Sequence, residues 1–297
     1  MGDMDLDKAK LVEALKGVKC TEVILYGSYA YGTPGPESDL DILLVTDVGL
    51  AKGQEDEIER KLEEASGVKV DMWVYSPWRM AEEAPHSTMI PDAVTKGVVL
   101  LPEGREHSLY MDLAKEWSAE ATALFHLKMA NRFLNLMHHD WLDEDQEKDA
   151  ALRAEMREWG SVMAQSRAAS AVRNALWALL WSAEPTFSKQ QVAGLSGGGK
   201  WAHWSAPSLL KALERLSPES HEHIQAAADA LLAKPLWREL FNDTKAAGSR
   251  SDPLVPQAET KELVAKVKEM VDLIGLEVDA NLVKQAHEKD GPEASLA

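Results

Sequence analysis

The stretch that decides the fold runs from residue 26 to residue 45 and reads YGSYAYGTPGPESDLDILLV. It opens with a glycine–serine turn and ends in an apolar run in which Asp39 and Asp41 alternate with Leu40 and Ile42. Residues two apart in a strand project to the same face, so both aspartates share one face while the leucine and isoleucine point to the core. The stretch therefore predicts a strand that begins with two like charges side by side.

Two neighbouring carboxylates predict a bound cation. Like charges this close repel each other unless a cation neutralises them. Carboxylate oxygens suit Mg²⁺, which keeps several waters and usually shares its shell with substrate phosphates. Asp71 lies on the polar face of a later predicted strand, and it joins the cluster if the two strands pair. The pattern predicts a magnesium site.

The turn before the aspartates has the features of a phosphate site. Gly27 allows the backbone to approach a ligand closely, and Ser28 offers a hydroxyl and an amide at a predicted helix start. Exposed N–H groups at such a turn bind anions. A phosphate cradle beside a carboxylate-bound metal indicates phosphoryl or nucleotidyl transfer.

The rest of the chain predicts an α+β protein, in which a small mixed sheet precedes an all-helical bundle. Strands are predicted at 21–27, 38–47 and 68–76, with a short edge strand in 97–104. Helices are predicted at 5–17, 54–66, near 89–97, and in long amphipathic runs at 107–140 and 150–183. These elements predict a mixed-sheet domain over 1–104, a helical bundle over 105–247, a linker and C-terminal helix over 248–287, and a disordered tail over 288–297.

The amino-acid composition limits the kinds of molecule that the protein is expected to bind. The formal net charge of −17 over 297 residues repels a polyanion, so nucleic acid is disfavoured, while a cationic small substrate is tolerated. The single cysteine, Cys20, leaves no disulfide framework and no thiolate zinc cluster. No apolar run reaches the roughly 18 residues that a membrane span requires. We expect a cytoplasmic protein without a membrane partner; a homodimer is left open.

These residues resemble the nucleotidyltransferase superfamily with the DNA polymerase beta-like fold, in its minimal nucleotidyltransferase form. The matching pattern is Gly27-Ser28, Gly32, then Ser38-Asp39-Leu40-Asp41 opening a strand, and Asp71 on a later strand. The resemblance implies that the catalytic aspartates hold two Mg²⁺ ions, and that a nucleoside triphosphate, ATP or another, is a substrate. The implied metal ligands are Asp39, Asp41 and Asp71, and the implied nucleotide contacts are Gly27, Ser28 and Ser38.

The helical half resembles the HEPN-type bundle that often follows such domains, also seen in aminoglycoside and lincosamide nucleotidyltransferases. The resembling segment is MAQSRAASAVRNALWALLWSAEPTFSKQQVAGL, residues 163–195. HEPN ribonucleases carry an arginine followed four to six residues later by a histidine. Arg132 with His138 or His139 has that spacing, but Phe133 stands at a normally polar position. An ordinary helix surface is the favoured interpretation of that pair.

The sequence thus predicts a Mg²⁺-dependent nucleotidyltransferase that moves NMP, with AMP from ATP as the favoured case, onto a hydroxyl of a small molecule and releases pyrophosphate. An aminoglycoside-like antibiotic is one candidate acceptor, because an acidic cleft suits a polycation. Glu116 or Glu120 is the candidate general base, since both follow the domain junction. The alternative is a regulatory fusion of toxin–antitoxin type that AMPylates a protein. Addition of nucleotides to RNA ends is opposed by the net charge.

Overall fold

The structure is a computed structural model that describes residues 6–36, 38–142, 150–186, 205–242 and 255–290. The chain forms two compact units, Met1–Ser118 and Ala119–Ala297. The domain boundary predicted at residue 104 stays a prediction. In the structure, the segment between 104 and 118 belongs with the sheet.

The first unit is built on a four-stranded mixed sheet in the order β3-β2-β1-β4. The strands are β1 (Glu22–Tyr26), β2 (Leu40–Val45), β3 (Val70–Tyr75) and β4 (Val98–Leu101). β1 pairs antiparallel with β2 and with β4, whereas β2 and β3 run parallel. With the helical second unit, this sheet confirms the predicted α+β class, and β4 is the edge strand that the sequence predicts.

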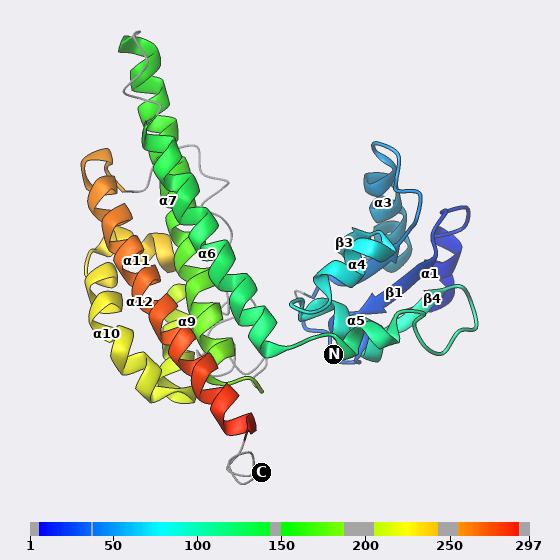
Figure 1. Ribbon diagram of the computed structural model, residues 1–297. Helices are drawn as coiled ribbons and strands as arrows, with labels where there is room; N and C mark the ends of the chain where they lie inside the picture. Colours follow the sequence, from blue (N-terminus) through cyan, green and yellow to red (C-terminus); the bar gives the residue numbers. More distant parts are fainter. Residues whose placement is uncertain (1–5, 37, 143–149, 187–204, 243–254, 291–297) are drawn as a thin grey trace. The chain divides into compact units, whose positions relative to one another are not determined.

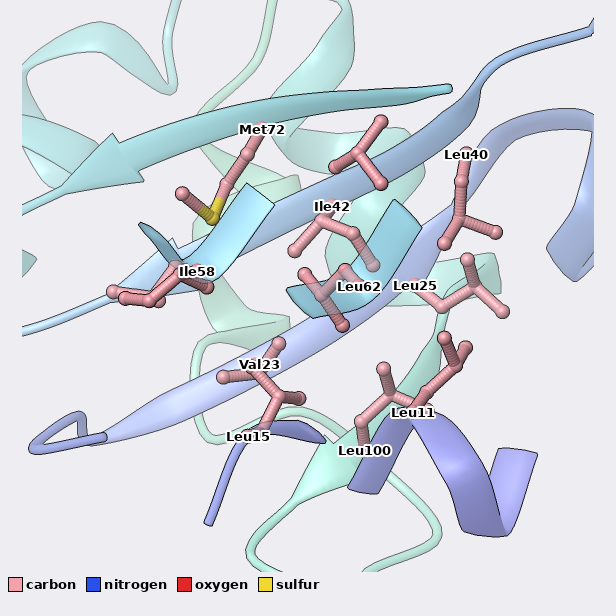
Figure 2. Close-up of a cluster of buried hydrophobic side chains, with 12 residues drawn as sticks. Leu11, Leu15, Val23, Leu25, Leu40, Ile42, Ile58, Leu62, Met72 and Leu100 are labelled. Atoms are coloured by element: carbon pink, nitrogen blue, oxygen red, sulfur yellow. The ribbon is translucent and has the colours of Figure 1, made fainter. Parts of the chain in front are cut away.

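Helices cover both faces of the sheet. They are α1 (Lys8–Ala14), α2 (Gly27–Ala30), α3 (Gln54–Ser66), α4 (Pro77–Glu83), α5 (Met89–Lys96) and the 3₁₀ helix η1 (Met111–Lys115). On one face, α1 and α3 bury Leu11, Ile58 and Leu62 against apolar side chains of β1, β2 and β3 (Figure 2). Leu40 and Ile42 lie in this cluster, so the alternate residues of β2 point to the opposite face.

The opposite face of the sheet carries a second core, and Asp41 and Asp71 project from this face. Ile24, Leu43 and Tyr75 pack there against side chains of α4 and α5. Tyr110 and Leu113 cover part of this cluster from the segment that follows β4. The sheet is therefore covered by an apolar core on both faces, and Tyr26, Leu40 and Val70 extend these cores to the end of β1 and the beginnings of β2 and β3.

Two elements differ from the prediction. Helix α4 was not predicted, although Ser76 caps it through its side chain and Pro77 occupies its first turn, which is a recognisable start signal. The long helix predicted from residue 107 begins at Ala119 instead. Residues ahead of that point make tertiary contacts with the sheet: buried Ser108 bonds to Glu22, and Leu113 packs on the second core. Amphipathic spacing alone does not reveal those contacts.

The second unit is helical throughout its described residues. Its helices are α6 (Ala119–Leu142), α7 (Ala150–Ala183), α9 (Ala206–Leu216), α10 (Pro218–Leu232), α11 (Pro235–Asn242) and α12 (Gln257–Asp290). α7 packs against α6 and α12 (Figure 1). Its second half is buried on nearly all sides, with Trp177 and Trp181 among the buried residues. A helix that is apolar all round is typical of the centre of a bundle.

Several sequence hypotheses reach beyond the described residues. Of the segment compared with HEPN bundles, 163–183 lies in α7, whereas 187–195 lies outside the described residues. The side chains of His138 and His139 lie outside them too, so the arginine–histidine pair is not tested. α12 extends to Asp290, and the tail from 291 onward is not described. Among the described residues, no helix combines the length and apolarity that crossing a bilayer requires.

Candidate active site

Strand pairing brings two of the predicted carboxylates together. In the parallel register of β2 and β3, Asp41 lies directly opposite Asp71. In the antiparallel register of β1 and β2, Tyr26 lies opposite Asp41 on the other side. Paired strands lie about 4.8 Å apart, and directly paired residues project to the same face. One row across the sheet therefore carries Tyr26, Asp41 and Asp71, in that order.

Gly27 lies against the central carboxylate of this row. A Cβ atom on Gly27 would lie 2.0 Å from Oδ2 of Asp41 and 2.8 Å from its Cγ, so no larger residue fits without displacing the aspartate. The backbone φ of Gly27 is +69°, which also favours glycine. The turn continues through α2, where the amide of Tyr31 donates to the carbonyl of Gly27 and that of Thr33 to the carbonyl of Ser28. The glycine–serine turn and Asp41 are thus immediate neighbours.

Asp39 and Ser38 lie in the loop that enters β2. Asp39 precedes the strand by one residue and is partly buried. The Ser38 side-chain oxygen accepts a hydrogen bond of 2.8 Å from the Gly35 amide, and the Ser38 amide donates to the Gly35 carbonyl. Ser38 therefore closes the loop ahead of the carboxylates, and its predicted contact with a nucleotide stays a prediction.

Two tyrosines, Tyr26 and Tyr31, lie near the carboxylate of Asp41. Burial, and then the nearby charges of Asp41 and Asp71, raise the pKa of Tyr26 above its ordinary value. Burial and a hydrogen bond to Asp92 raise the pKa of Tyr31 in the same direction. Both phenols remain protonated at neutral pH. Tyr31 also joins the end of α2 to α5, because Asp92 belongs to that helix. Sequence reasoning overlooked both tyrosines; the YGSYAY spacing around the turn was the available signal.

The donor set fits a hard divalent cation with an incomplete protein shell. Within the described ranges, no three His, Cys, Asp or Glu side chains converge into a ready metal cage. Mg²⁺ does not need one, because it is usually held by one or two carboxylates, with waters and substrate phosphates completing an octahedron. Asp41 and Asp71, adjacent in register and beside the Gly27 turn, match that requirement.

The two candidate general bases are exposed. Glu116 follows η1 in the first unit, whereas Glu120 lies in the first turn of α6 in the second. Their assignment as general bases stays a prediction.

A mixed sheet that holds paired carboxylates beside a glycine–serine turn is the arrangement expected of a metal-dependent nucleotidyl-transfer domain. The family described as nucleotidyltransferase domain matches residues 8–94 of this chain. That range contains the turn, both strand aspartates and most of the sheet. The match supports the nucleotidyltransferase superfamily for this region and a transferase of nucleotidyl groups as its activity. No curated protein matches the chain.

Proposed function

We propose that the chain transfers a nucleoside monophosphate, in the first instance AMP from ATP, to a hydroxyl group of a small molecule. One observation carries the proposal: Asp41 lies between the Gly27–Ser28 turn on one side and Asp71 on the other. A triphosphate bound at the turn would place its α-phosphorus beside these carboxylates. Members of the matched domain family generally use a nucleoside triphosphate and a divalent metal.

The chain's residues have separate tasks in this reaction. Asp39, Asp41 and Asp71 would hold Mg²⁺, two ions in the favoured case. Bound there, the metal would neutralise charge on the phosphates and align the reacting oxygens. Gly27 leaves space for the carboxylate of Asp41, and Ser28 would contact the phosphates through its hydroxyl and amide. Tyr26 and Tyr31 stay neutral and add no negative charge to the triphosphate site.

The chemical step balances as an in-line displacement. The acceptor oxygen forms a bond to the α-phosphorus, and the bond from that phosphorus to the bridging oxygen of the β-phosphate breaks. Pyrophosphate leaves, and the acceptor proton passes to a carboxylate base. The small-molecule class of the acceptor, including an aminoglycoside-like one, rests on the acidic charge of the chain and on resemblance. Modification of a protein is the second candidate, supported by the resemblance of the helical unit alone.

The test is transfer from ATP labelled at the α-phosphate, compared between the wild type, Asp41→Asn and Asp71→Asn. Each substitution removes a charged ligand while keeping the side-chain shape, so we expect transfer to fall at least about 1,000-fold in each. Mg²⁺ with ATP should raise the melting temperature of the wild type, because a ligand that binds the native state stabilises the fold. The melting temperature of the variants should not rise, because each has lost a carboxylate that would hold the metal.

The matched control is Asp112→Asn, which removes an exposed carboxylate of the same unit that pairs with Lys115 at the surface. It should transfer as the wild type does. Full activity of Asp41→Asn would end the proposal. Transfer of the label to protein in a cell extract, with none to small hydroxyl compounds, would select the protein-modifying alternative.

A further inference from the structure

Trp73 is an exposed aromatic ring beside the candidate active site. It lies on β3, two residues after Asp71, and so about 6.6–6.8 Å further along the same face of that strand. Its side chain is 47% exposed, whereas Leu43, opposite it on β2, is fully buried. Further along β3, Tyr75 on this face is buried as well. Of the three β3 side chains on this face, Asp71, Trp73 and Tyr75, the first is a candidate metal ligand and Trp73 is the exposed apolar one.

The position of β3 in the sheet explains why the indole ring of Trp73 is exposed to solvent. β3 is the edge strand next to β2, so the side chains of its polar face border solvent where the sheet ends. The folding of the unit gains little from a large ring in that position, because its burial is incomplete. A half-exposed tryptophan next to a polar site is a typical contact surface for a ligand.

The geometry of the proposed reaction indicates from which side the acceptor approaches. The Gly27–Ser28 turn follows β1, on one side of Asp41, whereas Asp71 and Trp73 lie on β3, on the other side. In an in-line displacement, the attacking oxygen and the leaving oxygen stand on opposite sides of the phosphorus. If pyrophosphate leaves from the turn, the acceptor approaches from the β3 side.

We propose that Trp73 forms the acceptor subsite and that the acceptor carries its hydroxyl on a saturated ring of the sugar or cyclitol class. The C–H face of such a ring packs on the indole, which leaves its hydroxyl beside Asp71. This inference rests on the proposed transferase function and adds the place where the acceptor binds. An open-chain polyol offers no flat face to the indole and gains less from it.

The experiment compares ring-bearing and open-chain acceptors in the full chain. The ring probes are methyl α-D-glucopyranoside, myo-inositol and kanamycin A; the open-chain probes are sorbitol and glycerol. Transfer from α-labelled ATP is measured for the wild type, Trp73→Ala and Trp73→Phe. We expect the wild type to prefer ring acceptors. In Trp73→Ala, their KM should rise about 5- to 100-fold, the range that stacking on an aromatic side chain gives. The KM for ATP should stay within about twofold.

Trp73→Phe keeps an aromatic ring and should stay within about threefold of the wild type, which separates loss of the contact from loss of the fold. Trp78→Ala is the matched control, because Trp78 is 69% exposed and lies on α4 rather than on the strand. It should change neither KM.

Three results would overturn the subsite: equal use of sorbitol and methyl glucoside by the wild type, an unchanged ring-acceptor KM in Trp73→Ala, or equal effects of Trp73→Ala and Trp78→Ala. Release of no pyrophosphate from Mg²⁺–ATP by the wild type, with any acceptor or with water, would instead refute the transferase function itself.

Discussion

At the scale of single residues, the close approach between Gly27 and Asp41 is the most specific feature of the candidate site. Many glycines adopt a positive φ in turns, and Gly32 of the same segment does so at +71°. Among the glycines in the described part of the chain, only Gly27 also makes room for a candidate metal-binding carboxylate through its missing side chain. Substitutions at the two glycines therefore separate the effect of the positive φ, which both share, from the effect of a side chain beside Asp41, which only the substitution at Gly27 introduces.

Gly27→Ala should lower nucleotidyl transfer by at least about 100-fold, because its Cβ displaces the carboxylate of Asp41 and small misplacements of catalytic groups are this costly. Gly32→Ala meets no atom within 4 Å of its Cβ and should keep most of the activity. Both should destabilise the fold by about 1–2 kcal/mol, the cost of a left-handed backbone in alanine. Label-transfer rates and urea unfolding measure the two effects; equal losses of activity would show that the contact is unimportant.

At the scale of elements, a buried carboxylate fastens the segment after β4 to the sheet. Glu22 on β1 is fully buried, and it accepts hydrogen bonds from the Ser108 hydroxyl at 2.6 Å and from the Leu109 amide at 2.9 Å. These bonds satisfy two side-chain oxygens that would otherwise be costly to bury. They also explain why the chain does not continue as a helix through this segment.

Glu22→Ala should reduce the free energy of unfolding of the first unit by about 2–4 kcal/mol, because a buried hydroxyl and an amide lose their partner. Urea unfolding followed by circular dichroism measures this change. Glu64→Ala, which removes an exposed carboxylate paired with Arg60, is the control and should change stability by less than about 1 kcal/mol. Similar losses in both variants would contradict the role of the buried bonds.

A second element-scale contact joins α10 to α12. Nδ1 of His223 lies 2.8 Å from Oε2 of Glu277, whose other oxygen accepts a bond from Ser220. The hydrogen bond and charge of Glu277 raise the pKa of His223 above its ordinary value of 6.5. A raised folded pKa gives stability that is fully present below the unfolded value and is lost as the pH rises through the folded value.

His223→Gln should therefore lower the melting temperature of the bundle most near pH 6, and the difference from the wild type should shrink towards about pH 9. Thermal melts across this range measure the effect. Glu277→Gln removes the same ion pair and should show the same trend. A difference that is constant with pH would mean that the contact acts without a charge on His223.

At the scale of the whole molecule, the chain consists of two units with separate cores. Residues 1–118 contain all four strands and both apolar clusters of the sheet. The second unit is organised around the buried half of α7. The candidate carboxylates, the turn and Trp73 all belong to the first unit, so binding of a nucleoside triphosphate is expected to be a property of that unit.

A fragment of residues 1–118 should fold alone and bind Mg²⁺–ATP with an affinity within about fivefold of the full chain. A fragment of residues 1–104 ends at the boundary predicted from the sequence and lacks the partners of Glu22. It should be less stable by about 2–4 kcal/mol. Calorimetry and titration with ATP compare the two. Equal stability of the fragments would favour the boundary at 104.

Much of the first unit could be predicted from the sequence because its signals are local. An apolar run defines β2 and alternating apolar residues define β3, each within about two residues of the observed ends, and the helix predicted over 54–66 coincides with α3. The same alternation places Asp41 on the face opposite Leu40 and Ile42. Local patterns did not reveal that residues 107–118 bond to the sheet, since the partner of Ser108 lies 86 residues away.

By itself, the sequence determined the α+β class, the strand that carries Asp41 and the face from which Asp41 projects, because side-chain direction follows from strand geometry alone. Only the tertiary structure decided that β3 pairs in parallel with β2, so that Asp71 stands opposite Asp41. It also decided that Gly27 lies against that carboxylate and that Trp73 is left open at the edge of the sheet. These are relations between segments distant in the chain, and they arise from strand pairing and packing, which no local spacing specifies.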